Sequence, residues 1–342
     1  MKVFCSPDHR LHFPEAELAG GRLVRPFECP ERVDIVLKRL QERQFTDVLS
    51  PAEADLNPVQ RLHDAAYLSF LASAWREWQR AGYEGELIPT TFAARRMRQQ
   101  APDSISGKAG YYAFAAETAI TAGTWQAAQA SCAAAQSAQR AVAAGDPAAF
   151  ALCRPPGHHA ASDLFGGYCF LNNAAVAAQM FLDEGAQCVA VLDVDFHHGN
   201  GTQDIFYHRD DVFFASLHGH PEDAFPYFSG FADEIGVGAG EGCTLNLPLR
   251  PGTAFDAWSS ALDLAIARIA AFGAEALVVS LGVDTFKDDP ISFFRLESDD
   301  FQAMGQRIAR LKLPTVFLME GGYAVEAIGV NTVNVLEGFL NR

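Results

Sequence analysis

The chain has 342 residues, of which 49% are hydrophobic and 20% are charged, and its formal net charge is −16. This composition is typical of a soluble globular protein, and the acidic balance argues against a nucleic-acid surface and favours cationic small molecules as partners. No apolar run is long enough to span a membrane, and the first residues contain no signal-peptide hydrophobic region, so we expect a cytoplasmic protein. The seven cysteines are scattered without a CxxC pair, which favours reduced thiols over a disulfide framework or a cysteine zinc site.

From about residue 110 onward, short apolar runs alternate with helical patterns. The Ala-rich stretch 126–144 has the composition of a packed helix. The patterns after it predict strands at 150–153, 188–195, 212–218, 276–282 and 315–321, and helices at 172–185 and 255–273. Strands separated by helices predict an α/β fold, here a single domain over 1–342 with an open, mostly parallel sheet and helices on both faces.

One segment, 82–110, does not fit this alternation. It is rich in Gly and Pro, has no clean periodicity, and is long for a plain connection. Its apolar residues must either be buried or form an exposed patch, and such patches mark interfaces. We therefore expect an interface or functional loop, with packing on its own subunit as the plainer alternative.

Polar side chains follow five of the strands at the point where each strand ends. In chain order they are His158 and His159, then Asp193, Asp195, His197 and His198, then His218 and His220, then Asp284, and last Glu320 and Tyr323. Open parallel sheets bind ligands beyond the carboxyl ends of their strands, so these groups are expected to meet in one site.

Three of these residues have the types and spacing of metal ligands. Asp195 and His197 are two residues apart, and Asp284 follows a neighbouring strand. Three protein ligands with an open position describe a catalytic metal site, for which Zn²⁺ is the first choice, while the oxygen-rich set leaves Fe²⁺ or Co²⁺ open. A nearby histidine would take a proton from water, and Tyr323 would donate a hydrogen bond to the developing oxyanion.

Each of these residues alone has a plainer explanation. His158 and His159 are compatible with surface or core histidines, Asp193 with a strand-end cap, and Tyr323 with a core tyrosine. His218 and His220 are interpreted as structural. The convergence of five strands on one edge outweighs these alternatives.

The motifs, taken in order, resemble the arginase/histone-deacetylase superfamily. They are RPPGHH (154–159), GGYCFLNN (166–173), DVDFHHGNGTQ (193–203), ASLH (215–218) and EGGY (320–323). Within the superfamily, GVDTFKDDPISFF (282–294) and the segment 82–110 look like the bacterial acetylpolyamine amidohydrolases.

The resemblance implies a role for each matching residue in catalysis. It makes Asp195, His197 and Asp284 the zinc ligands. It assigns the acid–base and electrostatic roles to five residues: His159 as general base and acid, His158 as its electrostatic partner, Asp193 as the carboxylate bonded to His158, Tyr323 as the oxyanion donor, and Asn200 behind His159. Some deacetylases have an aspartate where Asn200 stands, so we expect a lower pKa for His159 than in those relatives.

The resemblance also implies substrate and potassium sites. The substrate positions are the Gly167 carbonyl for the amide N–H, the aromatic pair Tyr168 and Phe225 around a methylene chain, and Ile291 at the rim. A structural K⁺ ion is implied near Asp193, Asp195, His197, Ser216 and Leu217. Candidate acidic groups for a cationic amine are Glu15, Glu17 and Glu117.

The function implied is zinc-dependent release of acetate from N-acetylated polyamines or diamines. The resemblance further suggests a homodimer in which the segment 82–110 narrows the neighbouring active-site mouth. A protein lysine deacetylase is the main alternative, because it shares the chemistry and differs at the rim. A non-catalytic acetyl-compound binder is a third hypothesis, and arginase-like ureohydrolysis would normally need a two-manganese carboxylate cluster.

Overall fold

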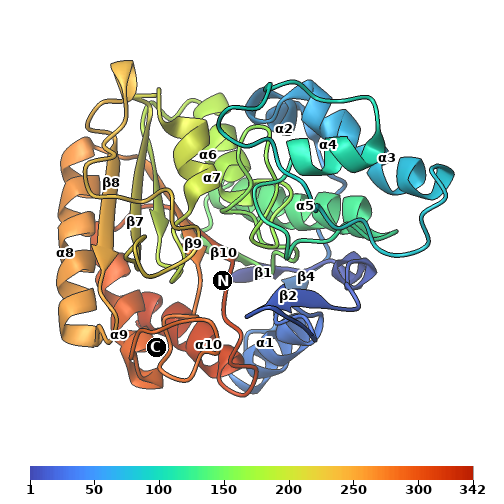
Figure 1. Cartoon of the computed structure of the whole chain (residues 1–342). Coiled ribbons are helices and arrows are strands. Elements are labelled where there is room, and N and C mark those ends of the chain that lie inside the picture. Colours follow the sequence, from blue (N-terminus) through green and yellow to red (C-terminus); the bar gives the residue numbers. More distant parts are fainter. Residues whose placement is uncertain (342) are drawn as a thin grey trace.

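The computed structural model describes residues 1–341, and its centre is one eight-stranded sheet with every neighbouring pair of strands parallel (Figure 1). The spatial order is β4-β1-β5-β10-β9-β6-β7-β8. In chain order the strands are β1 (Lys2–Phe4), β4 (Val48–Leu49), β5 (Ala148–Ala151), β6 (Val189–Asp193), β7 (Val212–Gly219), β8 (Thr244–Leu249), β9 (Ala276–Leu281) and β10 (Thr315–Met319).

Helices cover both faces of the sheet (Figure 1). One layer contains α1 (Glu31–Glu42), α8 (Phe255–Phe272), α9 (Ser298–Ile308) and α10 (Ile328–Phe339). The other contains α2 (Leu56–Leu62), α3 (Ala65–Arg80), α4 (Ile105–Tyr111), α5 (Thr124–Ala143), α6 (Asn173–Asp183) and α7 (Asn200–Phe206). Strand side chains alternate between two cores, so Val278 packs under the second layer and Val279 under the first. Burial on both faces explains why these strands are continuously apolar in sequence.

Short elements complete the chain. A two-stranded antiparallel hairpin pairs β2 (Glu17–Ala19) with β3 (Arg22–Val24). Three 3₁₀ turns are η1 (Pro7–Leu11), η2 (Gly238–Gly240) and η3 (Ala309–Leu311). Among residues 1–341, no helix is long and apolar enough to cross a membrane.

The predicted fold class is confirmed, with differences at particular elements. The strand predicted at 150–153 is β5 at 148–151, because Leu152 and Cys153 are as apolar and buried as the strand itself. The edge strand β8 was not predicted, since its sequence TLNLPL contains a proline and is only partly buried.

The segment 82–110 is irregular only as far as Ser104. Its last residues belong to α4, whose first turn is capped by Ser104 Oγ, 3.3 Å from the backbone N of Gly107. The Tyr83 ring stacks on Trp78 with centroids 3.8 Å apart, whereas Met97 is 58% exposed. The segment therefore packs partly on its own subunit and leaves a smaller apolar surface exposed.

Candidate active site

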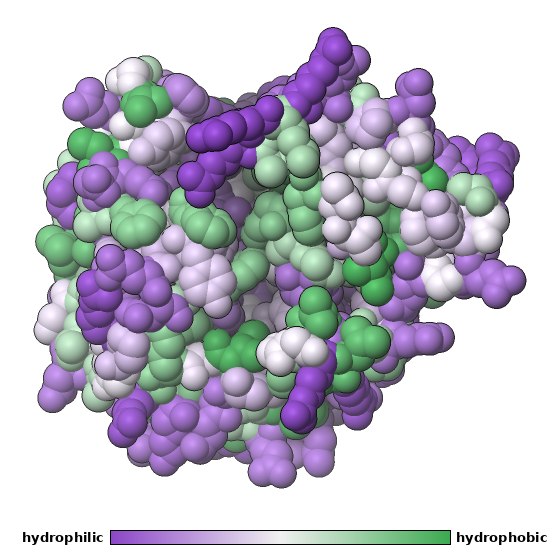
Figure 2. All heavy atoms as spheres, in the orientation of Figure 1, coloured by the Kyte–Doolittle hydropathy of each residue, from purple (hydrophilic) through white to green (hydrophobic). Residues whose placement is uncertain are grey.

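A cavity of about 290 Å³ lies beyond the carboxyl ends of the central strands. Its lining includes nine of the residues singled out from the sequence: Glu17, Glu117, His159, Gly167, Tyr168, His197, Phe225, Ile291 and Tyr323. In the orientation of Figure 2, hydrophobic side chains gather around recesses in the middle of the face, with hydrophilic side chains toward the periphery. The polar groups thus meet at one edge of the sheet, as the parallel topology requires.

The predicted metal ligands converge next to this cavity, and His197 lines it. Asp195 and His197 follow β6, Asp284 follows β9, and one ligand atom from each lies within 4.8 Å of the others. His197 Nδ1 is 3.0 Å from Asp284 Oδ2 and 3.3 Å from Asp195 Oδ1. All three side chains are buried.

The electrostatics of this triad fit a cation. Burial and the neighbouring carboxylate of Asp195 raise the pKa of Asp284 to about 8. Burial opposes the charged form of His197, but its hydrogen bonds to both carboxylates outweigh burial and raise its pKa to about 9. His197 Nδ1 therefore lies between the carboxyl groups of Asp195 and Asp284, and a metal ion would replace the protons that these three groups hold at neutral pH.

The backbone leaves space for these carboxylates and orients them. A Cβ atom at Gly282 would lie 2.1 Å from Asp195 Oδ2, and one at Gly321 would lie 2.5 Å from both Asp195 Oδ2 and Asp284 Oδ2. The backbone N–H of Gly321 donates to Asp195 Oδ2 at 2.7 Å. Glycine is required at both positions because any side chain would fill the place of the ligand oxygens.

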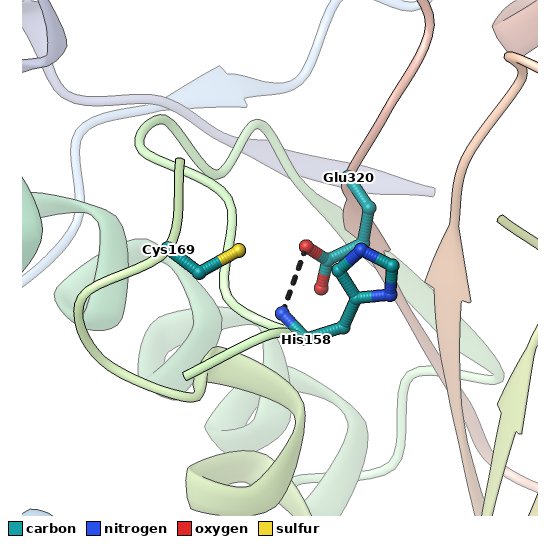
Figure 3. A group of neighbouring side chains, drawn as sticks. All are labelled: His158, Cys169 and Glu320. Carbon is teal, nitrogen blue, oxygen red and sulfur yellow. Dashed lines mark hydrogen bonds between the residues drawn. The ribbon is translucent and has the colours of Figure 1, made fainter. Parts of the chain in front are cut away.

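A second group of ligand-type residues, His158, Cys169 and Glu320, lies nearby (Figure 3). The dashed line in Figure 3 joins the backbone N of His158 to the Glu320 carboxylate, which also accepts the N–H of Gly157 at 2.7 Å. Burial raises the pKa of the Cys169 thiol well above 9, so the thiolate that a metal needs is disfavoured. Glu320 holds the 157–158 turn, and the three residues fit a metal less well than the first group does.

The two adjacent histidines have opposite electrostatic environments. His158 Nδ1 is 2.9 Å from Asp193 Oδ2, and His159 Nδ1 is 2.7 Å from Asn200 Oδ1. Burial disfavours the charged form of His158, but Asp193 and Asp195 outweigh it and raise its pKa to about 10. Burial, together with the neighbouring histidines, lowers the pKa of His159 well below 6.5. One ring is therefore cationic and the other neutral at pH 7.

Tyr323 stands in the loop after β10, on the wall of the cavity. Its ring lies 4.8 Å from the guanidinium carbon of Arg32 and 5.8 Å from the Tyr168 ring. Within residues 1–341 its hydroxyl makes no hydrogen bond, and burial raises its pKa well above 10. The phenol therefore stays protonated and available as a donor.

Two consecutive residues of the cavity wall, Gly167 and Tyr168, have positive φ angles. Gly167 has φ +55°, and a Cβ there would lie 2.2 Å from His159 Cδ2, so only glycine lets the backbone approach the imidazole. The Phe225 ring lies 5.2 Å from the His159 ring. The Tyr168 hydroxyl donates to Glu17 Oε1 at 3.1 Å, which joins the aromatic wall to the hairpin β2–β3.

Two of the three candidate acidic residues line the cavity. Glu17 is buried, and burial raises its pKa to about 7. Glu117 is half-buried, with Oε1 2.9 Å from the backbone N of Gly167. Glu15 is exposed and lies outside the cavity lining, where its backbone N–H donates to Glu86.

The residues named for potassium lie where β6 and β7 run side by side. Asp193 and Ser216 are register partners, and Leu217 follows in the buried part of β7. Ser216 Oγ is 2.8 Å from His218 Nδ1. His218 also contacts the carbonyl of Gly230 at 2.8 Å, a position that agrees with a structural histidine.

Two buried residues near the site were not singled out from the sequence. Arg32 Nε donates to the carbonyl of Gly322 at 2.8 Å and its Nη2 to that of Glu320, while Asp289 accepts the N–H of Tyr323 at 2.7 Å. Both act on the turn between β10 and Tyr323 from distant parts of the chain. No local pattern marks them, because their partners are backbone groups brought close by the fold.

Comparison with known proteins agrees with this geometry. The histone deacetylase domain family matches residues 26–339. The chain is 58% identical to acetylpolyamine amidohydrolase 1 of Pseudomonas aeruginosa, covering 98% of this chain and 97% of the relative. It is 57% identical to the acetylpolyamine amidohydrolase of Mycoplana ramosa, covering 99% of each.

A solved structure shows the same fold. The crystal structure of the acetylpolyamine aminohydrolase from Burkholderia pseudomallei aligns with a TM-score of 0.94 at 39% identity, covering 99% of this chain and 98% of that one. The resemblance drawn from the motifs is confirmed. The chain belongs to the histone deacetylase domain family of the arginase/deacetylase superfamily, and it is a hydrolase of the deacetylase class.

Proposed function

We propose that this deacetylase is a zinc-dependent amidohydrolase that removes acetyl groups from N-acetylated polyamines and diamines. One observation carries the proposal: a single cavity is lined by His197 of the metal-type triad, by His159 and by the two acidic side chains Glu17 and Glu117. Relatives named as acetylpolyamine amidohydrolases match nearly the whole chain, which supports this substrate class.

Asp195, His197 and Asp284 would hold the zinc ion, and Fe²⁺ or Co²⁺ would suit the same donors. When bound, the metal supplies a Lewis acid that polarises the acetyl carbonyl and acidifies water. A structural K⁺ ion is proposed near Asp193, Asp195, His197, Ser216 and Leu217. Its partial neutralisation of the buried carboxylates would offset part of the cost of burying them.

His159 acts as the general base and then as the general acid. Because Asn200 Oδ1 accepts from Nδ1, the proton of neutral His159 is held on Nδ1 and Nε2 is free to accept. Nε2 takes the proton of the attacking water and later returns it to the leaving amine. His158 stays protonated against Asp193, and its positive charge would help to stabilise the negative charge that develops on the oxygens of the tetrahedral intermediate.

Tyr323 donates its hydroxyl proton in a hydrogen bond to the oxyanion. Its raised pKa keeps that proton in place, and a buried site makes the interaction stronger than it would be in water. The hydroxyl is free of other hydrogen bonds within residues 1–341, so no competing partner must be released first.

The walls select a thin, linear, cationic substrate. Tyr168 and Phe225 would enclose the methylene chain, the Gly167 carbonyl would accept the amide N–H, and Ile291 would contact the chain at the rim. Glu17 and Glu117 would receive the distal ammonium group. A protein lysine deacetylase would use the same chemistry. It would need a cavity mouth wide enough for a peptide backbone, whereas a polyamine deacetylase would not.

We further propose a cytoplasmic homodimer in which the segment 82–104 contributes to the interface. An apolar groove of about 320 Å³ lies between this segment and the hairpin β2–β3. Leu23 of that hairpin is 72% exposed and lines this groove. A partner subunit over the groove would cover Leu23, and it would narrow the mouth of the cavity because Glu17, Leu18 and Glu117 line both the groove and the cavity.

The metal site can be tested without relying on turnover alone. Asp284→Ala should lose both bound zinc, measured by elemental analysis, and acetate release from acetylputrescine, because one of three ligands is gone. Asp288→Ala, four residues away and exposed, is the matched control and should keep both. A full equivalent of zinc in Asp284→Ala would remove Asp284 from the metal site.

A further inference from the structure

The loop that carries Tyr323 has little regular structure of its own to fix its shape. Residues 320–327 form no helix or strand, and Tyr323 directly follows Gly321 and Gly322, of which Gly322 has φ +127°. Two consecutive glycines allow many backbone directions. The position of the tyrosine hydroxyl must therefore be set by contacts outside the loop.

The buried carboxylate of Asp289 supplies such contacts. Its Oδ2 accepts the backbone N–H of Tyr323 at 2.7 Å and that of Ala324 at 3.2 Å. Its Oδ1 accepts the N–H of Ile291 at 3.1 Å. One side chain, only 6% exposed, thus ties the Tyr323 loop to the segment carrying Ile291, and both residues line the cavity.

Burying a carboxylate costs free energy, because its charge must leave water. Three backbone N–H donors offset this cost at Asp289, and two of them belong to Tyr323 and Ala324. With three N–H groups facing it, an amide at this position would direct its own NH₂ toward at least one donor. The geometry is therefore specific to a carboxylate.

We propose that Asp289 is a positioning residue, which fixes the Tyr323 hydroxyl at the reacting carbonyl and holds Ile291 at the facing rim. The inference rests on the proposed role of Tyr323 as oxyanion donor. It goes beyond that role because it names the residue that positions the Tyr323 hydroxyl, Asp289, which itself would touch neither substrate nor metal.

A double-mutant cycle tests the inference. Asp289→Asn should lower kcat for acetylputrescine roughly 10- to 100-fold, the effect of small misplacement of a reacting group, while KM changes much less. In the Tyr323→Phe background, Asp289→Asn should lower kcat no further, since the donor it positions is already absent. Asp288→Asn makes the same chemical change at an exposed neighbour and should leave kcat unchanged.

The outcomes separate this inference from the proposed function. If Tyr323→Phe alone has no effect on kcat, the oxyanion role fails, and the inference fails with it. If Tyr323→Phe is impaired but the two effects multiply, Asp289 acts independently of Tyr323 and only the inference is overturned. Should Asp289→Asn not fold, Asp289→Glu takes its place in the cycle, and failure of both to fold assigns Asp289 to stability and also overturns it.

Discussion

The proposed roles of Tyr323 as a proton donor and of His159 as a base are opposite, and their environments suit these roles. Burial keeps the proton on the Tyr323 hydroxyl and keeps the His159 ring neutral. At neutral pH the Tyr323 hydroxyl can therefore donate a hydrogen bond, and the uncharged His159 ring can accept a proton. The hydrogen bond from His159 Nδ1 to Asn200 Oδ1 leaves Nε2 as the ring nitrogen that would accept a proton in the proposed role.

Removing the Tyr323 hydroxyl isolates the oxyanion interaction. Tyr323→Phe keeps the ring against Arg32 and Tyr168 and removes one hydrogen-bond donor, so kcat should fall roughly 10²- to 10³-fold. Substrate binding and zinc content should persist. A normal kcat in steady-state kinetics, with zinc confirmed in the same sample, would assign the whole of oxyanion stabilisation to other groups.

The raised pKa of Glu17 predicts that substrate binding depends on pH. Burial raises its pKa from an ordinary 4.5 to about 7, so the side chain gains its charge as pH rises through 7. A cationic amine binds the charged form better, so KM for acetylputrescine should fall between about pH 6 and pH 8, where an amine with a lysine-like pKa stays protonated. Glu17→Gln should give a flat KM over this range, whereas the exposed Glu15→Gln should behave as wild type.

The same pKa has an opposite consequence for stability. A group whose pKa is raised on folding contributes most below its unfolded value and loses that contribution as pH rises through its folded value. The contribution of Glu17 to the free energy of unfolding should therefore decline as pH rises from about 4.5 to 7. Denaturant titrations of wild type and Glu17→Gln should diverge in this window, and parallel curves would contradict the raised pKa.

At the scale of elements, the sequence predicts the central strands of the sheet, and it misses short elements as well as several helices, of which α3 with 16 residues is the longest. The central strands are continuously apolar because both of their faces are covered, so their existence and parallel order follow from pattern alone. β1 has three residues and β4 has two, too few for any period to show. α4 was hidden because ISGKAGY contains two glycines in seven residues.

The same contrast applies to the site. Residues directly after strands could be named, because topology alone brings strand ends together. Arg32 reaches the turn at Gly322 from a helix 290 residues away, and Asp289 reaches Tyr323 across 34 residues. Such contacts depend on the packed fold and leave no local pattern to find.

The segment 82–104 yields a prediction about its element as a whole. Tyr83 Oη lies 2.8 Å from Ser106 Oγ, so the ends of the segment are close enough to be joined by a short Gly-Ser linker after deletion of 84–104. The deleted protein should be monomeric by light scattering and should gain activity on acetyl-lysine peptides relative to acetylputrescine. A variant that stays dimeric and equally selective would show that the segment is neither interface nor gate.

At the scale of the whole molecule, charge and shape point to the same class of substrate. The net charge of −16 attracts cations at long range, and Glu17 and Glu117 in the cavity lining would act on a bound cation at contact distance. The metal-type triad, the neutral His159 and the buried Tyr323 would together hydrolyse any acetylated amine that reaches them. Selectivity therefore depends on the mouth and walls.

The most direct test of the account is kcat/KM for acetate release from N-acetylputrescine and from an acetyl-lysine peptide, measured with the same zinc-loaded enzyme at one ionic strength. A cavity built for a free cationic diamine should favour acetylputrescine by about tenfold or more, since pocket contacts supply discrimination of that order. A peptide hydrolysed as well as, or better than, acetylputrescine would contradict the proposed substrate class while leaving the deacetylase chemistry intact.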